Sequence, residues 1–530
     1  MEILDGLQIG FATAFTLQNL LYCFAGVSIG MIVGVLPGIG HLAAISLLMP
    51  LTFHVPATSA LVMLAGIYYG AQYGGSITSI LLNIPGTASS AVICLDGHPM
   101  ARNGRAGPAL LVTTIASFIG SCIAILVLVL LAPPLARVAL AFHSADYFAM
   151  MLLGLVASGA LVDEKPLIGI ASVLIGLVIG LAGIDVNSGA MRFTFGVPDM
   201  FNGISIIVLA MALFGIVEVI SSVGRTGGIH PGAKRLTFRG LMPSREETRR
   251  STAPILRGAA LGTGIGILPG AGGGSMASFM AYAVEKRVAR EPGRFGKGAI
   301  EGIAAPESAN NAAAQSAFIP TLTLGIPGDA IMALMLGALM IHGIMPGPRV
   351  VTESPELFWG LAVSFLVGNL MLLVLNIPLI QVWVKILQIP YRLMFPAIVL
   401  LIAVGSYSIG RSSFDVMMIA GLGFAGYLLL GLGFSAAPIL LGFILGPLLE
   451  ENLRRSLVVS RGDFAVFVER PISATFVALS VAMLAWAVYS GLRRRKEQAA
   501  AEAAATEDDG PGADRPATHP MKTREERNLR

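Results

Sequence analysis

Residues 26–40 read GVSIGMIVGVLPGIG, and this stretch determines what kind of fold the chain can adopt. Its glycines recur every fourth residue, and Pro37 stands immediately before the last of them, Gly38. A four-residue step places the glycines on one face of a helix, where another backbone can approach closely. Pro37 removes a helix donor, and Gly38 tolerates backbone angles that other residues resist. The stretch therefore predicts a tightly packed helix that ends abruptly.

The same pattern returns in the second half of the chain. Residues 258–272 read GAALGTGIGILPGAG, offset by 232 residues from the first stretch. A repeat of this kind predicts a chain built from two related halves. The residues expected to pack or break these two helices are Gly34, Pro37, Gly38, Gly266, Pro269 and Gly270.

The composition is that of a membrane protein. Of 530 residues, 55% are hydrophobic and only 12% are charged, whereas soluble domains carry about 25% charged residues. Apolar runs of roughly 17–25 residues, long enough to cross a bilayer, recur along the chain. We expect an all-α polytopic membrane protein with about 10–14 transmembrane segments. The N-terminal MEILDGLQIG lacks the basic region of a cleavable signal peptide, so the first helix is expected to be retained.

Lysine and arginine are concentrated in two places. Eight of them lie between residues 225 and 257, where Glu246 and Glu247 are the only acidic residues, and a run of four begins at Arg493. Because basic residues collect in cytoplasmic loops, both places are predicted to be cytoplasmic. The predicted organisation is a first membrane half at 1–224, a basic linker at 225–254, a second membrane half at 255–492 and a disordered polar tail at 493–530.

Two other apolar runs stop at a Pro-Gly pair. The first ends in Asn83-Ile84-Pro85-Gly86-Thr87 and the second in Gly325-Ile326-Pro327-Gly328-Asp329. Pro and Gly often merely kink membrane helices, but broken helices in corresponding positions of two halves indicate a secondary transporter's binding site. Irregular backbone persists in a membrane only against protein, water or ligand. Helix N-termini there offer N–H groups to an anion, and unwound carbonyls offer oxygens to a cation. We expect 66–90 and 304–329 to meet at mid-depth in the bilayer.

A polar cluster precedes the second break, in the stretch 304–312. When the two Ile-Pro-Gly motifs are aligned, Asn310 and Asn311 fall opposite Tyr68 and Tyr69. Amide and hydroxyl oxygens suit Na⁺, and the same groups can hydrogen-bond a carboxylate. Helix capping or interhelical hydrogen bonding explains such residues as well, and Glu307 is open to a structural role. The candidate substrate- and ion-binding residues are Asn83, Pro85, Gly86, Thr87, Ser89, Ser90, Glu307, Ser308, Asn310, Asn311, Pro327, Gly328 and Asp329.

The coupling ion is predicted from the same residues. Neither broken segment contains Lys or Arg, so an anion bound there needs a co-bound cation to offset its charge. A proton needs a titratable carrier, and only Glu307 and Asp329 qualify nearby. The neutral oxygens therefore favour Na⁺ over H⁺, with no other cofactor and no metal centre.

Other classes of protein lack the residues that they require. The sequence GAGGGS at 270–275 lacks the lysine of a phosphate-binding loop. The stretch 38–43 formally fits G-x-G-x-x-A but lies in a membrane run without a βαβ context. There is no HExxH and no GxSxG motif, which disfavours an enzyme. The net charge of +4 is explained by membrane orientation rather than by nucleic acid.

Several long motifs resemble the large membrane subunit of tripartite tricarboxylate transporters, the TctA family. They include GVLPGIG, AGIYYGAQYGGSITSILLNIPGTASS at 65–90, LDGHPMARNGRAG at 95–107, AAPESANNAAAQSAFIPTLTLGIPGD at 304–329 and GIMPGP at 343–348. The resemblance covers nearly the whole chain apart from the polar tail. His41 and His98 depart from the family pattern, which has Pro and Tyr at these positions.

The resemblance implies a permease of the bacterial inner membrane that works with a small membrane subunit and a periplasmic solute-binding protein. The cargo is expected to be a tri- or dicarboxylate taken up with an ion gradient, and its identity is expected to be set by the binding protein. The family resembles transporters built from inverted repeats, which implies an elevator-like mechanism. A self-sufficient carrier without partners, or an H⁺-coupled form of the same permease, are the alternatives.

Overall fold

The computed structural model describes residues 3–36, 40–161, 166–185, 188–222, 238–268, 273–386 and 391–508. The first half contains α1 (Ile3–Ala14), α2 (Leu17–Val35), α3 (Gly40–Thr52), α4 (Ala57–Leu82), η1 (Ala88–Ile93), α5 (Cys94–Met100), η2 (Ala101–Arg105), α6 (Ala106–Ala139), α7 (Ser144–Leu161), α8 (Pro166–Gly180), β1 (Gly183–Ile184), β2 (Met191–Arg192), η3 (Pro198–Met200), α9 (Ile206–Ala210), η4 (Met211–Ile216) and α10 (Val217–Ser222).

The second half contains α11 (Phe238–Leu241), α12 (Arg245–Gly266), α13 (Gly273–Val288), η5 (Pro292–Arg294), α14 (Glu301–Ser316), α15 (Phe318–Leu324), α16 (Ala330–Ile341), α17 (Val350–Glu353), α18 (Pro355–Asn376), α19 (Ile380–Ile386), α20 (Tyr391–Gly410), α21 (Ser413–Gly431), α22 (Ala436–Val459), α23 (Val466–Glu469) and α24 (Pro471–Asp508). The described chain is thus helical apart from one short antiparallel hairpin, β1–β2.

The first glycine ladder packs α2 directly against the backbone of α4. A methyl group added at Gly26, Gly30 or Gly34 would collide with the carbonyl oxygen of Met63, Ile67 or Ala71, respectively. The glycines Gly66, Gly70 and Gly74 of α4 also lie against the backbone of α2, where an added methyl group would come within 2.6–3.0 Å of backbone atoms. Small residues on both faces therefore permit backbone-to-backbone packing, as the spacing predicted.

The second ladder packs α12 against α14 in the same way. A methyl group at Gly258, Gly262 or Gly266 would meet the carbonyl oxygen of Ala305, Ala309 or Ala313. These three alanines lie 242 residues after Met63, Ile67 and Ala71, and Pro327 lies 242 residues after Pro85. The residues that the two ladders contact are thus separated by the same number of residues as the two Ile-Pro-Gly breaks.

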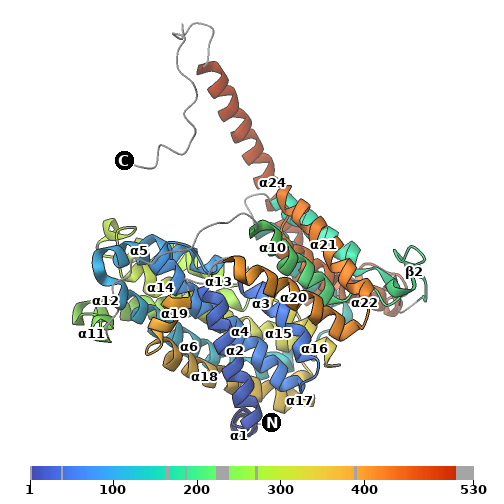
Figure 1. Cartoon of the computed structure of the whole chain (residues 1–530). Coiled ribbons are helices and arrows are strands. Elements are labelled where there is room, and N and C mark those ends of the chain that lie inside the picture. The colour runs from blue at the N-terminus through green and yellow to red at the C-terminus, as the bar shows by residue number, and fades with distance from the viewer. Residues whose placement is uncertain are drawn as a thin grey trace.

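The two helix pairs share a central group of helices. Helix α6 packs on α12 and α14, and α18 packs on α1 and α4. Figure 1 shows α10, α21 and α22 gathered on one side of the molecule, while α24 extends away from the body on the side opposite to α1. In that second group α22 packs on α7 and α8, and α24 packs on α7. The fold therefore places the α4–α14 region next to a second helical layer.

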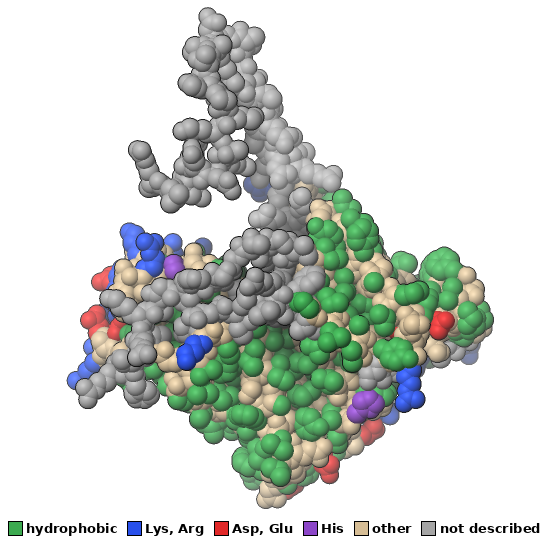
Figure 2. Space-filling view, in the orientation of Figure 1, with side chains coloured by type: hydrophobic (Ala, Val, Ile, Leu, Met, Phe, Trp, Pro, Cys, Tyr) green, Lys and Arg blue, Asp and Glu red, His purple; other side chains and the backbone are tan. Residues whose placement is uncertain are grey.

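The described helices are those of a multi-pass membrane protein. Six are long and apolar enough to cross a bilayer, and seven further apolar helices are shorter. Leu126, Val374 and Leu400 are more than half exposed on three different helices, as expected for lipid-facing side chains. In Figure 2 hydrophobic side chains cover most of the visible face, and charged side chains gather toward its margins. The predicted number of crossings, about 10–14, stays a prediction because the breaks divide several apolar runs into short helices.

The basic linker and the tail differ in part from the expectation. Helix α12 begins at Arg245, inside the predicted linker, and α24 continues through residues 493–508, where disorder was expected. The Ala/Glu-rich composition of 498–508 has high helix propensity and continues the apolar helix before it. Residues 225–237 and 509–530 lie outside the described residues.

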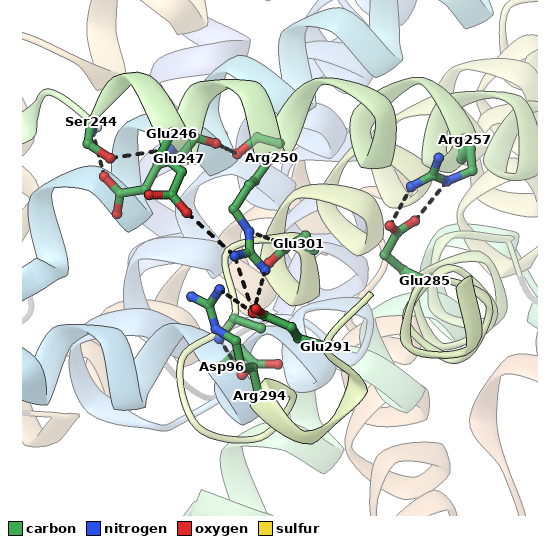
Figure 3. A network of polar contacts seen from close by, with 12 residues as sticks. Asp96, Ser244, Glu246, Glu247, Arg250, Arg257, Glu285, Glu291, Arg294 and Glu301 are labelled. Carbon is green, nitrogen blue, oxygen red and sulfur yellow. Dashed lines mark hydrogen bonds and ion pairs between the residues drawn. The ribbon is translucent and has the colours of Figure 1, made fainter. Parts of the chain in front are cut away.

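Arg250 and Arg257, from the basic stretch 225–257, belong to a network of ion pairs (Figure 3). Arg250 bonds Glu301 at 2.6 Å and also contacts Glu291, whose pKa is lowered by hydrogen bonds from Arg294 and Arg250. Arg257 forms a bidentate pair with Glu285. The positive charges of α12 therefore hold this helix to α13 and α14, in addition to any role in orientation.

Candidate functional site

The two Pro-Gly breaks have the same backbone conformation. Helix α4 ends at Asn83 in the left-handed region, with φ of 60°, and α15 ends at Gly325, with φ of 70°. Four residues later an extended residue starts a new helix, Thr87 before η1 and Asp329 before α16. Thr87 and Ser90 form a capping box, while an Asp329 carboxylate oxygen accepts the Met332 N–H at 2.8 Å. Each break therefore presents the first turn of a new helix.

Both new helices begin at one cavity of about 940 Å³. The first turns of α3 and α13, which follow the two glycine ladders, line the same cavity through Gly40, His41, Gly274 and Ser275. Four helix N-termini that follow the ladders and the breaks, two from each half, thus face one space, and the first residues of α22, Ala436 and Ala437, line it as well. Their partial positive charge favours an anion there, and no Lys or Arg is among the described residues that line the cavity.

Gln72 of α4 connects the two halves beside this cavity. Its side-chain oxygen accepts three hydrogen bonds: from Ser89 at 2.9 Å, from Asn310 at 3.0 Å and from Thr87 at 3.3 Å. The first two donors belong to η1 and α14, so one oxygen ties the first break to the second half. The Asn310 amide oxygen is buried without a hydrogen-bond partner. This leaves an acceptor oxygen next to the cavity wall at Gly274.

Two carboxylates line the cavity, Asp329 and Glu218. Asp329 caps α16 and lies against Gly273, where an added methyl group would meet its oxygen at 2.5 Å. Tyr68 also lines the cavity and neighbours Asp329. The cavity thus combines acidic side chains with helix N-termini, an environment that suits an anion bound together with a cation.

Glu307 lies outside this cavity, in the contact between α4, α6 and α14. Its carboxylate accepts hydrogen bonds from Ser76 at 2.6 Å, Ser117 at 2.8 Å and Asn311 at 3.0 Å. The side chain is 1% exposed. Together with the Gln72–Asn310 bond, these contacts confirm that 66–90 meets 304–329, whereas their depth in the bilayer stays a prediction.

The structure separates the predicted residues into three groups. Pro85, Gly86, Thr87, Ser89, Gly328 and Asp329 line the cavity. Asn83 terminates α4, Ser90 caps η1, and Ser308 donates to the Ile255 carbonyl on α12, so these three act in helix ends and packing. The remaining candidates are not among the residues that line the cavity: Glu307, Asn310, Asn311 and Pro327. Gly34 and Gly266 pack as predicted, while Pro37, Gly38, Pro269 and Gly270 lie outside the described residues.

Several residues at or near the site were not singled out from the sequence as ligands, and Tyr68 and Glu218 of the cavity lining are among them. Gln72 is a lone amide in a 26-residue apolar helix, and that polarity was the available signal. Asp96 is fully buried and accepts the Gly298 and Ala299 N–H groups at 2.8 Å, which joins α5 to the start of α14. His41 lines the cavity, whereas His98 contacts the Ile80 carbonyl away from it. No group of three or more metal-ligating side chains was found among the described residues.

Comparison with known proteins gives a match over most of the chain. Residues 20–441 match the tripartite tricarboxylate transporter TctA family. An uncharacterized 52.8 kDa protein of Agrobacterium vitis, from the TAR-I ttuC' 3' region, is 48% identical over 498 residues, which is 94% of this chain and 99% of that protein. An uncharacterized protein from the TAR-II ttuC' 3' region of the same organism is 53% identical over 237 residues, 45% of this chain and 98% of that protein. No solved structure matches the chain.

Proposed function

Because the chain belongs to the tripartite tricarboxylate transporter TctA family, we propose that it is the large permease subunit that imports a carboxylate of the tri- or dicarboxylate class. The family is the large component of a tripartite transporter, so the chain acts in transport rather than catalysis. The proposed partners are a small membrane subunit and a periplasmic solute-binding protein. The proposed location is the bacterial inner membrane with a cytoplasmic C-terminus, because the basic run at Arg493 follows the apolar part of α24.

The observation that carries this proposal is the cavity of about 940 Å³ at which the helices after both ladders and both breaks begin. A volume in the range of roughly 300–1,000 Å³ is typical of a small-molecule site. Helix N-termini hold a carboxylate by N–H groups and by the helix dipole, without an arginine. The hydroxyls of Thr87 and Ser89 add polar contacts at the same wall. Together with a co-bound cation that offsets the acidic lining, these features fit a carboxylate better than a wholly apolar cargo.

We place the coupling ion, Na⁺, beside the same cavity. Thr87, Ser89, Gln72 and Asn310 bring neutral oxygens together at the contact between the halves. The unpartnered oxygen of Asn310 and the carboxylate of Asp329 are further acceptors that a cation would satisfy. A cation bound here offsets the charge of the carboxylate cargo, which couples the two bindings.

The proposed mechanism is elevator-like movement of two inverted repeats. Support comes from the matching glycine contacts of the α2–α4 and α12–α14 pairs. The two breaks also have the same backbone conformation. In this mechanism the α2–α4 and α12–α14 pairs carry the site past the layer that contains α7, α8 and α22. Transporters of this kind bind their cargo at broken helices from the two repeats.

Uptake of radiolabelled carboxylates into proteoliposomes tests the proposal. The permease is reconstituted with the small subunit, with and without added binding protein, under Na⁺ or pH gradients. We expect uptake only with the binding protein and an inward Na⁺ gradient. Uptake without the binding protein would favour the self-sufficient carrier, and uptake driven by a pH gradient in Na⁺-free buffer would favour H⁺ coupling. No uptake of any tri- or dicarboxylate under any gradient would contradict the proposed cargo.

A further inference from the structure

The Glu307 carboxyl is enclosed by neutral groups from three helices. Ser76 of α4 donates to one carboxyl oxygen, and Ser117 of α6 and Asn311 of α14 donate to the other. The Asn311 amide nitrogen also contacts the Ser117 hydroxyl at 2.9 Å and the Glu307 carbonyl at 3.1 Å, which fixes its orientation. All four side chains are at most 3% exposed. The four residues form a closed shell that we call the Glu307 shell.

The Glu307 carboxyl has no ion pair in the part of the chain that the structure describes. Among the described residues, none of the ion pairs involves Glu307, although Arg250 and Arg257 of the neighbouring α12 pair with Glu301 and Glu285. An isolated carboxylate is strongly disfavoured in a low-dielectric interior, and such groups neutralise instead. A proton or a bound metal cation are the two ways to neutralise it.

The space beside the carboxyl favours the proton. The void between Tyr73, Thr113, Thr114, Asn376 and the Glu307 shell has no room for a water molecule. A hydrated cation therefore does not fit in this conformation. The nearest amide group, that of Asn311, directs its N–H toward the carboxyl, which repels a cation at that position. A proton requires neither space nor acceptor ligands.

We propose that Glu307 is the binding site of a proton that is distinct from the Na⁺ and carboxylate sites and whose binding is coupled to theirs. The inference rests on the proposed transport function and adds a second coupling ion to it. The proton stays on the carboxyl oxygen nearest Ser76, and the resulting O–H group donates a hydrogen bond to the Ser76 hydroxyl oxygen. The Ser76 hydroxyl in turn donates to the Gln72 carbonyl, which lies at 3.5 Å. When another transport state admits water to the shell, the proton passes to that water and leaves a carboxylate that accepts from Ser76 again.

Two helices, α4 and α14, connect the Glu307 shell to the cavity. Ser76 lies one turn after Gln72 on α4, and Asn311 follows Asn310 on α14. Gln72 and Asn310 bond each other at the cavity wall. A change in that bond when the cavity fills or empties therefore moves two members of the Glu307 shell. This shared pair is the physical basis for coupling the proton to the cargo.

The groups that face Glu307 leave few other carriers for this titration. Tyr73 of α4 is the titratable side chain that lines the same void. On the other elements packed against α14, Asp96 of α5 accepts from Tyr282 and from two backbone N–H groups, and Glu285 of α13 pairs with Arg257. Arg105 at the start of α6 pairs with Glu247. Arg250 and Arg257 of α12 pair with Glu301 and Glu285, and α18 contributes Asn376 to the void.

Infrared difference spectroscopy of the purified full-length protein tests the proton directly. The spectrum of the wild type minus Glu307→Gln at neutral pH should show the carbonyl stretch of a protonated carboxylic acid. Carboxylate bands instead, or conversion of the acid band to carboxylate bands when Na⁺ is added, would overturn the proposal. Glu301→Gln is the matched control on the same helix, because Glu301 pairs with Arg250 and should lose carboxylate bands only.

A second variant keeps the test valid if Glu307→Gln does not fold. Ser117→Ala removes one donor to the carbonyl oxygen of the acid, so the acid band should move to higher frequency. An unshifted band would show that another group carries the proton, which overturns the assignment. The band should also fall as pH rises in the wild type.

Transport measurements separate this inference from the proposed function. With saturating Na⁺ and binding protein, wild-type uptake should change with pH, and the pH profile should flatten in Glu307→Gln. A wild type that transports, with a variant that keeps the same pH profile, overturns the proton site alone. A wild type that transports no carboxylate overturns the function, and the infrared result then decides the proton site independently.

Discussion

The two broken segments share a backbone but differ in side-chain chemistry. Asn83 and Gly325 have the same left-handed conformation, and Thr87 and Asp329 the same extended one. The first break contributes a neutral hydroxyl at the helix start, whereas the second contributes a carboxylate. In the helices before them, Gln72 of the first half corresponds to Ala314 of the second. The repeat thus fixes where four helices begin, and the differences between the halves decide what the cavity can bind.

The glycine ladders are the part of the comparison in which the halves agree most, so breaking them has the largest expected effect. Gly30→Leu or Gly262→Leu places a side chain into the backbone of Ile67 or Ala309. Overpacking of this severity should remove most of the folded protein from the membrane fraction. Detergent-extracted protein is quantified by size-exclusion fluorescence.

Gly264→Leu is the matched control, because the added side chain on α12 meets nothing within 4 Å of its Cβ position. It should express like the wild type. Normal folding and full transport by both ladder variants would show that the ladders are incidental.

Only the first half has a glutamine at the position of Gln72, so replacing it tests how much this difference between the halves contributes to the site. Gln72→Leu leaves Ser89, Asn310 and Thr87 without their shared acceptor. An unsatisfied buried donor costs about 1–3 kcal/mol, so uptake should fall by roughly tenfold to hundredfold. Initial uptake rates in proteoliposomes measure this.

The control for Gln72 is Gln315→Leu on α14. Neither amide atom of this buried glutamine has a hydrogen-bond partner, so its replacement should change uptake little. Equal effects of the two substitutions would contradict a special role for Gln72.

Asn310 and Asn311 are neighbours whose side chains have different hydrogen-bond partners, Gln72 for Asn310 and Ser117 and Glu307 for Asn311. Asn310→Ala removes an amide beside the cavity, so the Na⁺ concentration for half-maximal uptake should rise several-fold, about 1 kcal/mol in free energy. Asn311→Ala removes a donor to Glu307 and should alter the pH dependence of uptake instead. Uptake titrated against Na⁺ and against pH for both variants distinguishes them. Identical profiles of the two variants would contradict this division.

A cysteine pair at Thr87 and Asp329 tests whether the two breaks share one cavity. Both residues line the cavity. A short bifunctional thiol reagent should link Thr87→Cys to Asp329→Cys in at least one transport state, in a background without Cys23, Cys94 and Cys122. Mass spectrometry of the digested protein detects the link. Its absence in every state would contradict a shared site.

Hydrophobic pattern and residue spacing were enough to predict the membrane class, the two ladders and the two breaks. These features follow from local rules: a four-residue step defines a helix face, and Pro-Gly ends a helix. The same rules did not separate residues that line the cavity from residues that support it. Ser308 and Asn83 have suitable side chains, but they are used for packing and for ending a helix.

The sequence by itself determined which helices pack closely and where they stop, because glycine spacing and proline act on the local backbone. Only the tertiary structure decided that Gln72 would join both halves and that Glu307 would form no ion pair with the arginines that the structure describes. Both outcomes depend on contacts between residues more than two hundred positions apart, such as Gln72 with Asn310 and Ser76 with Glu307. No local pattern contains that information, since the partner of a buried polar group is set by how the helices pack.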